Sequence, residues 1–355
     1  MKIGLVLPGN IWFSPYVKIY TQMLDKIGAS YDIISWNRDG RDAKTGFQFE
    51  LETDNSKSRL AKLLPYFQYI SFIKKTIKRE KYEKLVVFGP QMAILLSGFL
   101  AKNYKGRFIF DYRDLSIEQK TFLKRPFLSV LKNSCANVIS SPGFKKCLPE
   151  GFDYLLSHNF DIEIVRKALE NKQISEPQGK EINVLTIGGI RDYSSNIEVV
   201  KALANKPNFK LQFVGRGGAA ELIKSYADEN SIRNIEFEGF YPKEKEAGYI
   251  LDSSVLNIFY PKIISHSTAL SNRFYNALIY KRPMLVTANS TQGDFVAKHN
   301  LGLSLENCDG LQSKLEDYLS NLDYKAFAER CNALLDTFLE DYNKLEKTVV
   351  EFVSE

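Results

Sequence analysis

The chain has 355 residues, of which 44% are hydrophobic and 25% charged, and its formal net charge is +6. This composition is that of a soluble globular protein, and the length favours two domains of about 150 residues each over a single core. We expect no signal peptide from the first residues, and the longest apolar run, residues 92–101, is too short to span a bilayer. The four cysteines lack metal-type spacing, so we expect reduced thiols and a cytoplasmic location.

Strand-like and helix-like patterns alternate in the N-terminal half. We expect strands at residues 2–8, 31–36, 84–89, 107–112, 136–141 and 154–159, with helices at 14–28, 90–104 and 119–133. This alternation predicts a parallel sheet with helices on both faces.

The segment between Lys57 and Lys84 contains nine Lys or Arg residues and only two acidic ones, interleaved with Phe, Tyr, Ile and Leu. A basic, aromatic and amphipathic stretch fits an anionic membrane surface. A solvated helix face over a stripe of core residues is an equally good interpretation. We do not expect nucleic acid as a partner, because no recognised binding motif accompanies the charge.

Residues 162–181 are polar and resemble the end of one domain followed by a linker. The strand pattern then restarts at residues 182–188, 209–215, 234–240, 254–260 and 283–288. The predicted fold class is α/β, with two tandem Rossmann-like doubly wound domains and a C-terminal helical segment that packs on the outside. The predicted domain limits are residues 1–165, a linker at 166–181, residues 182–330, and a C-terminal helix at 331–355.

Ligands of such sheets bind beyond the carboxyl ends of the strands. After the first strand, Gly9 permits a close backbone approach and Asn10 can donate to an oxygen ligand, although a plain turn explains both. After the fourth, Arg113 lies between Asp111 and Asp114. Arg113 can bind phosphate and Asp114 can orient a hydroxyl, whereas a structural Asp–Arg pair is the alternative, favoured for Asp111.

Two glycine-rich stretches follow strands of the second half. Gly188 and Gly189 open a loop in which Arg191 can reach a diphosphate. Residues 215–220 fit the pattern G-x-G-x-x-A, which starts at Gly215 and suggests a nicotinamide-dependent oxidoreductase. That match is weak, because the fingerprint normally follows the first strand of its domain.

Residues 266–287 carry the strongest local signal. The loop at 266–270 is small and polar enough for its N–H groups to face a ligand, and Ser271 or Asn272 can cap the following helix. We expect Arg273 to add a mobile cation and Asn276 to hydrogen-bond a ribose hydroxyl. An ordinary capped helix is the alternative.

The sequence lacks the motifs of several other chemistries. The three histidines form no zinc-protease or triad pattern, and the sequence has neither Asp-x-Asp nor a phosphate-loop motif. We therefore expect no bound metal and no separate cofactor.

Residues 185–203, 211–261 and 271–287 together resemble the C-terminal half of retaining glycosyltransferases of family four. The N-terminal half is similar more loosely, at residues 111–115, 136–149 and 155–161. The resemblance implies the two-domain GT-B fold and a nucleotide-activated sugar, UDP- or GDP-linked, as co-substrate. It is greatest for hexosyltransferases that extend lipid-linked sugars of capsule, exopolysaccharide or O-antigen.

The resemblance also implies roles for individual residues. Phe240 and Tyr241 would lie over the nucleotide base, and Gly189 and Arg191 would approach the diphosphate. The remaining positions would hold the diphosphate and the sugar, and they are Ser267, Thr268, Ala269, Leu270, Ser271 and Asn272.

The chain departs from the family at two glutamates, whose positions fall on Thr268 and Asn276. The Asn276 carbonyl can still accept from a ribose hydroxyl, whereas Thr268 supplies no charge. Activity would then depend on backbone dipoles and arginines, and a degenerate binding or scaffold protein is the alternative.

The implied mechanism is a front-face transfer with retention at the anomeric carbon. Stabilisation of the leaving diphosphate would be the main catalytic effect, and Asp114 is our hypothesis for orienting the acceptor. The expected acceptor is a lipid-linked saccharide, for instance one carried on polyprenyl diphosphate, and the enzyme would act at the inner face of the membrane.

Overall fold

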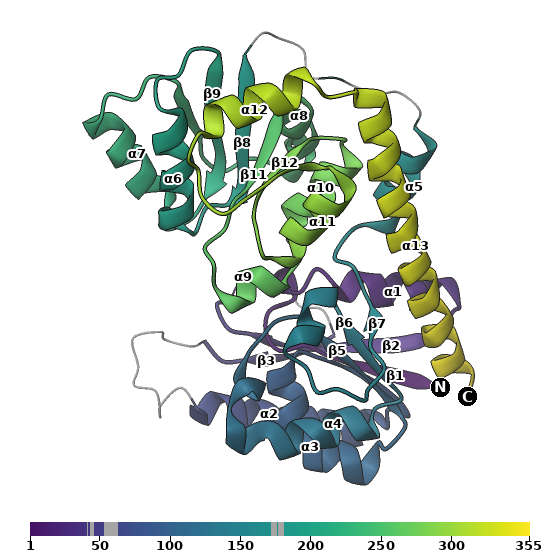
Figure 1. Ribbon diagram of the computed structural model, residues 1–355. Helices are drawn as coiled ribbons and strands as arrows, with labels where there is room; N and C mark the ends of the chain where they lie inside the picture. Colours follow the sequence, from purple (N-terminus) through teal and green to yellow (C-terminus); the bar gives the residue numbers. More distant parts are fainter. Residues whose placement is uncertain (41, 43–45, 53–62, 172–175, 177–180) are drawn as a thin grey trace. The chain divides into compact units, whose positions relative to one another are not determined.

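The computed structural model describes residues 1–40, 42, 46–52, 63–171, 176 and 181–355 (Figure 1). The chain divides into two compact units. Unit 1 consists of residues 1–158 and 340–355, and unit 2 consists of residues 159–339. Each unit is built on one parallel sheet, so the predicted α/β class with two tandem doubly wound sheets is confirmed.

The sheet of unit 1 has the order β3-β2-β1-β4-β5-β6-β7. Its strands are β1 (Lys2–Val6), β2 (Ser30–Asn37), β3 (Phe47–Glu50), β4 (Lys84–Phe88), β5 (Phe108–Tyr112), β6 (Ala136–Ile139) and β7 (Leu155–Leu156). The helices are α1 (Val17–Lys26), α2 (Leu63–Glu80), α3 (Pro90–Asn103) and α4 (Lys124–Asn133), with short 3-10 turns η1 (Ile11–Phe13), η2 (Ile117–Gln119), η3 (Thr121–Leu123) and η4 (Pro142–Lys146). Helices α2, α3 and α4 lie side by side on one face of this sheet (Figure 1).

Apolar runs explain the central strands of unit 1. Every residue of β4 and β5 is buried, which is the pattern of a strand covered on both faces. Helix α3 starts directly after β4, where Gly89 has a φ of +77° and Pro90 occupies the first helical position. A proline is well suited there because its missing N–H would have no helical partner.

The sheet of unit 2 has the order β10-β9-β8-β11-β12-β13. Its strands are β8 (Ile182–Gly189), β9 (Phe209–Arg216), β10 (Ile235–Glu238), β11 (Val255–Ile258), β12 (Met284–Thr287) and β13 (Gly302–Leu305). Its helical elements are α5 (Ile162–Glu170), α6 (Tyr193–Leu203), α7 (Ala220–Glu229), η5 (Lys243–Lys245), α8 (Glu246–Leu251), α9 (Ile264–Thr268), α10 (Asn272–Ile279), α11 (Thr291–His299), α12 (Leu311–Ser320) and most of α13 (Tyr324–Ser354).

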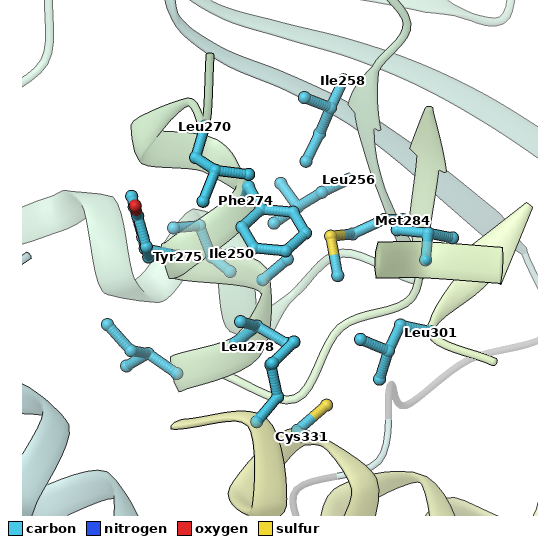
Figure 2. Packing of buried hydrophobic residues seen from close by; sticks show 14 of the residues in the cluster. Ile250, Leu256, Ile258, Leu270, Phe274, Tyr275, Leu278, Met284, Leu301 and Cys331 are labelled. Carbon is cyan, nitrogen blue, oxygen red and sulfur yellow. The ribbon is translucent and has the colours of Figure 1, made fainter. Parts of the chain in front are cut away.

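Two apolar clusters cover the two faces of this sheet, because successive strand residues point to opposite faces. One cluster joins the strands to α6, α7 and α12. The other contains Phe274, Tyr275 and Leu278 of α10, which pack toward Leu256 and Met284 of the strands (Figure 2). This packing fixes the position of α10.

The structure differs from the expected elements at β3 and β13, two short edge strands that the sequence did not indicate. Residues 124–133 form the helix expected at 119–133, and two 3-10 turns precede it.

The compact units differ from the predicted domain limits in two places. Helix α5 begins inside the first predicted domain, yet Val165 is fully buried in the core of unit 2. The C-terminal end of α13 belongs to unit 1, where Glu346 forms an ion pair with Lys26 at 2.8 Å. Residues 172–175 and 177–180 of the predicted linker lie outside the described residues.

Candidate functional site

A cavity of about 330 Å³ opens beyond the carboxyl ends of β8 and β11 in unit 2. These adjacent strands are followed by strands on opposite sides, β9 and β12, so the cavity lies at the point where the strand order reverses. It is lined by Ile187, Gly188, Gly189, Arg191, Asp192, Lys243, Glu246, Tyr260, His266, Ala269, Ser271, Asn272, Arg273, Asn276 and Gln292.

The start of α10 faces this cavity and is firmly held. Ser271 is the N-cap, and its hydroxyl accepts a hydrogen bond from the Phe274 N–H at 3.3 Å. The same hydroxyl and the Ser271 N–H both donate to Oε1 of Gln292, at 2.7 and 3.0 Å. A helix start carries partial positive charge, so this end of the cavity favours an anion.

Arg273 is an anchor and not the mobile cation that the sequence suggested. Its guanidinium is buried and donates to the carbonyl oxygens of Ile187, Gly189 and Asn257 at 2.5, 3.0 and 3.3 Å. These bonds tie α10 to the ends of β8 and β11. The charge therefore lies fixed at the wall of the cavity.

Arg191 is an exposed cation of the same cavity. Its guanidinium folds over Gly189, where an added Cβ would lie 3.4 Å from Nε. Nearby, the His266 ring stacks on Tyr260 with centroids 5.0 Å apart, and its Nε2 lies 3.6 Å from Oδ1 of Asp192. The Arg191 guanidinium and the His266 ring both line the cavity that a ligand would enter.

Glu246 is a lining residue that the sequence did not point to. Asn276 donates to Oε1 of Glu246 at 3.0 Å, and the Tyr241 hydroxyl donates to Oε2 at 2.8 Å. Lys243 forms an ion pair with the same carboxylate. Burial, together with this neighbouring carboxylate, raises the pKa of Tyr241 above its usual range. Residues 243–246 are alternating Lys and Glu, and nothing in that local pattern marks Glu246 as a site residue.

Six predicted residues of unit 2 do not line this cavity, and they are Ser267, Thr268, Leu270, Gly215, Phe240 and Tyr241. Ser267 lines an adjoining cavity of about 180 Å³ that shares Tyr260, His266 and Gln292 with it. Thr268 is buried, and its hydroxyl donates to the Ile264 carbonyl at 2.7 Å. The Leu270 side chain belongs to the core (Figure 2).

Gly215 has a packing role. Its φ is +131°, and an added Cβ would lie 2.0 Å from the Gly188 carbonyl oxygen. Gly217 shows the same restriction against the Ile190 carbonyl oxygen, also at 2.0 Å. The close approach of β8 and β9 therefore accounts for the glycines of the G-x-G-x-x-A match.

The two aromatic residues expected near a nucleotide base differ in exposure. Phe240 is 71% exposed, and the Arg216 guanidinium lies 5.5 Å from its ring centre. Tyr241 is half-buried, and its hydroxyl is held by Glu246 at 2.8 Å. Neither side chain lines the 330 Å³ cavity, although Tyr241 lies directly behind Glu246.

The predicted site residues that follow β1 in unit 1, Gly9 and Asn10, make contacts within the local loop. Asn10 is buried, and its amide donates to Asn37 and Asp39 at 3.2 and 2.7 Å. A Cβ on Gly9 would lie 3.4 Å from Nε of Arg38. These contacts match the plain-turn alternative.

The Asp-Arg-rich segment after β5 separates into a buried pair and an exposed acid. Arg113 donates to Asp111 at 2.6 Å and to the Ser157 hydroxyl at 2.8 Å, and the ion pair is almost entirely buried. The structural interpretation therefore fits Asp111 and Arg113. Asp114 as a whole residue is exposed to solvent. Partial desolvation of its carboxyl group nevertheless raises the pKa of Asp114 above the ordinary value, despite the opposing charge of Arg113.

The described residues contain neither a cluster of metal-ligating side chains nor a helix that could span a membrane. No group of three or more His, Cys, Asp or Glu side chains in the described part could hold a metal ion. No helix there is both long enough and apolar enough to cross a bilayer.

Neither a family model nor a curated protein matches the sequence. Solved structures do match over nearly the whole chain. Sucrose-phosphate synthase from Thermosynechococcus elongatus is 15% identical with a TM-score of 0.71, covering 100% of this chain and 99% of its own. WaaG, a glycosyltransferase involved in lipopolysaccharide biosynthesis, is 14% identical with a TM-score of 0.62, covering 98% and 99%. HepE from Anabaena, solved in complex with UDP, is 11% identical with a TM-score of 0.66, covering 99% of both chains.

The chain has the GT-B fold. The two parallel sheets and the C-terminal helix agree with these structures over the full length. At identities this low, the structural likeness establishes the fold alone. The reaction has to be argued from the residues of the site.

Proposed function

We propose that the protein is a glycosyltransferase that moves a sugar from a nucleotide sugar to a saccharide acceptor. The observation that carries this proposal is the cavity at the strand-order reversal of unit 2. It brings together a capped helix start, the exposed Arg191 and the loop at Gly188 and Gly189. Backbone N–H groups and an arginine suit a diphosphate. HepE, which shares the fold, has been solved with UDP and with UDP-glucose.

The proposed reaction retains the configuration of the anomeric carbon. The bond from that carbon to the diphosphate oxygen breaks, and a bond to the acceptor oxygen forms on the same face. The acceptor proton passes to the departing phosphate oxygen. Arg191 and the start of α10 stabilise the negative charge that develops there, and no metal ion is needed in this scheme. Asp114 is the proposed residue that orients the acceptor hydroxyl.

The proposed acceptor is a lipid-linked saccharide of a surface polysaccharide, and the proposed location is the cytoplasmic face of the membrane. Helix α2 supports this part of the proposal. Leu64 and Phe67 are 62% and 61% exposed, and Lys75 and Lys78 are exposed farther along the helix. Its buried stripe also fits a helix over a core, and residues 57–62 of the basic segment lie outside the described residues.

Two other functions compete with this one. A degenerate binding or scaffold protein would bind the nucleotide without turning it over, because Thr268 supplies no charge near the sugar. An NAD-dependent oxidoreductase loses its main support, since strand packing accounts for Gly215 and Gly217.

The proposal is tested by incubating the purified chain with a panel of UDP- and GDP-linked sugars and measuring release of the nucleoside diphosphate. We expect release from at least one donor, increased by a saccharide acceptor. The variant Arg191→Ala should lower the rate at least tenfold, and Arg233→Ala, an exposed arginine outside the cavity, should not. Binding without release would support the scaffold alternative, and a thermal shift with NAD alone would support the oxidoreductase.

A further inference from the structure

We propose that Glu246 binds the ribose hydroxyls of the nucleotide and thereby selects ribonucleotides. This inference rests on the proposed function, because it concerns the same cavity. The carboxylate beside Asn276 belongs to α8. Four observations lead to the proposal.

The first observation is the position of the carboxylate. Glu246 is the first residue of α8, its side chain is 14% exposed, and it lines the cavity together with Asn276. The diphosphate-binding features are the start of α10 and Arg191. A carboxylate would repel phosphate oxygens, so it can face an anionic ligand only where that ligand presents hydrogen-bond donors. Vicinal ribose hydroxyls are such donors.

The second observation is the acceptor capacity of Glu246. A carboxylate has about four lone-pair sites. Asn276, Tyr241 and Lys243 donate to them in this structure. Lys243 is 77% exposed, so its ion pair is weak and the ammonium can move into solvent at little cost. Two acceptor sites then become available for a pair of hydroxyls.

The third observation is the dependence of Asn276 on Glu246. The Asn276 amide nitrogen lies 3.0 Å from Oε1 of Glu246, where only a donor is tolerated. A glutamate at position 276 would bring two carboxylates together, and their repulsion would disfavour the arrangement. The amide at position 276 and the carboxylate at position 246 therefore depend on each other.

The fourth observation is the support behind the carboxylate. The Tyr241 hydroxyl donates to Oε2 at 2.8 Å, and the Tyr241 ring packs edge-on against Tyr249 with centroids 5.9 Å apart. The Tyr241 hydroxyl thus holds the Glu246 carboxylate in position. A fixed acceptor gives a hydroxyl-bearing ligand more binding energy than a mobile one, because less freedom is lost.

The test uses calorimetric titration of the full-length chain with UDP and with 2′,3′-dideoxy-UDP, and with the corresponding pair of guanine nucleotides in parallel. The wild-type chain should prefer the ribose form about tenfold or more, as expected for hydroxyls bound to a charged acceptor. Glu246→Gln should remove most of this preference and leave the affinity for the dideoxy form nearly unchanged. Glu244→Gln, an exposed neighbour outside the cavity, should keep it.

Placing the carboxylate on α10 in place of α8 provides a second, independent check. Asn276→Glu alone should weaken binding of the ribose form, and Glu246→Ala combined with Asn276→Glu should recover the preference. Thermal melting of each variant verifies that it is folded. The outcome for Asn276→Glu decides the question if the Glu246 variants do not fold.

Two outcomes separate the possible failures. Binding of a ribonucleotide without preference over its dideoxy form, or full preference in Glu246→Gln, would overturn the role of Glu246 alone. Binding of neither nucleotide pair to the wild-type chain would overturn the proposed function, and the role of Glu246 with it.

Discussion

Two arginines of the candidate site differ in what holds them. Arg273 is buried and donates to three backbone carbonyl groups, whereas Arg191 is exposed at the cavity. A buried hydrogen bond that involves a charged group contributes more to stability than an exposed one. Truncation of Arg273 should therefore lower the stability of the protein, whereas truncation of Arg191 should weaken ligand binding.

Arg273→Ala should lower the free energy of unfolding by about 2–4 kcal/mol, because three carbonyl groups, two of them in buried hydrogen bonds, lose their donor. Arg191→Ala should leave that free energy within about 0.5 kcal/mol of wild type and weaken nucleoside diphosphate binding roughly tenfold or more. Urea unfolding and calorimetric titration of both variants measure the difference. Equal stability of the two variants would contradict the anchoring role of Arg273.

The local sequence was sufficient to predict a cap at the start of α10 and insufficient to predict that Glu246 lines the cavity. Capping depends on residues three positions apart, so a cap at Ser271 or Asn272 could be predicted, and the hydrogen bond from the Phe274 N–H to the Ser271 hydroxyl identifies Ser271 as the cap. Glu246 meets Asn276 only through the packing of α8 beside α10, thirty positions apart in the chain. No local pattern encodes that contact. The burial of Arg273 was missed for the same reason, since its partners lie on β8 and β11.

Helix α10 is positioned by its apolar face. Phe274 is fully buried and contacts the rings of Phe295 and Phe338, with centroids 5.8 and 6.4 Å apart. The helix therefore holds its N-terminal end, where Ser271 and Asn272 face the cavity, in one place.

Phe274→Ala should lower the free energy of unfolding by about 3–5 kcal/mol, as a cavity in a packed core does. Leu222→Ala, at a residue of α7 that is 57% exposed, should cost less than about 0.5 kcal/mol. Denaturant unfolding monitored by fluorescence compares the two. A small effect of Phe274→Ala would show that α10 is not fixed by this cluster.

The C-terminal end of α13 is tied to unit 1 by a histidine. His158 is buried and its Nε2 lies 3.2 Å from Oδ2 of Asp341. Burial lowers the pKa of His158, and this effect outweighs the opposing influence of Asp341. Burial alone would raise the pKa of Asp341, but the hydrogen bond from His158 and the charge of Lys344 lower it overall.

Stability should therefore fall as the pH drops below about 6.5, the ordinary pKa of histidine. In that range the unfolded chain binds a proton that the folded His158 does not, and linkage then favours unfolding. Asp341 adds its own loss only in more acidic solution, below the ordinary range of a carboxyl. Urea unfolding at pH 7.5 and pH 5.5 should show a smaller pH effect in His158→Gln than in wild type. His266→Gln is the control, and an unchanged pH effect in His158→Gln would refute the assignment.

Central strands were predictable and edge strands were not. Strands β1, β4 and β5 are apolar runs buried on both faces, so the sequence marks them clearly. Strands β3 and β13 contain no buried residue and sit at sheet edges, where the apolar requirement is weak. The polar pattern of residues 162–181 predicts a domain end and a linker and gives no sign of α5, because this helix buries only a narrow face, chiefly Ile162 and Val165.

The architecture of the protein followed from the alternation of strands and helices, because a parallel sheet requires a crossover after each strand. The place of the candidate cavity also followed, at the carboxyl ends of the strands. The reaction does not follow from the fold, since one fold hosts many activities. It depends on the few side chains that the cavity brings together.

The proposed membrane contact predicts binding to anionic vesicles. The full chain should co-sediment with vesicles containing phosphatidylglycerol and not with neutral phosphatidylcholine vesicles, and added salt should weaken the binding. Replacing both Leu64 and Phe67 by serine should reduce it several-fold, since both side chains are exposed. Leu222→Ser, in unit 2, is the matched control. Equal sedimentation of all three proteins would rule out α2 as the contact.

The central claim is that a nucleoside diphosphate occupies the cavity beside α10. Amide hydrogen exchange of the wild-type chain, with and without saturating UDP or GDP, tests it most directly. We predict slower exchange at residues 188–192 and 271–276, and no change at 215–220. Protection confined to 215–220 or to unit 1, or no protection at a saturating nucleotide concentration, would contradict the account.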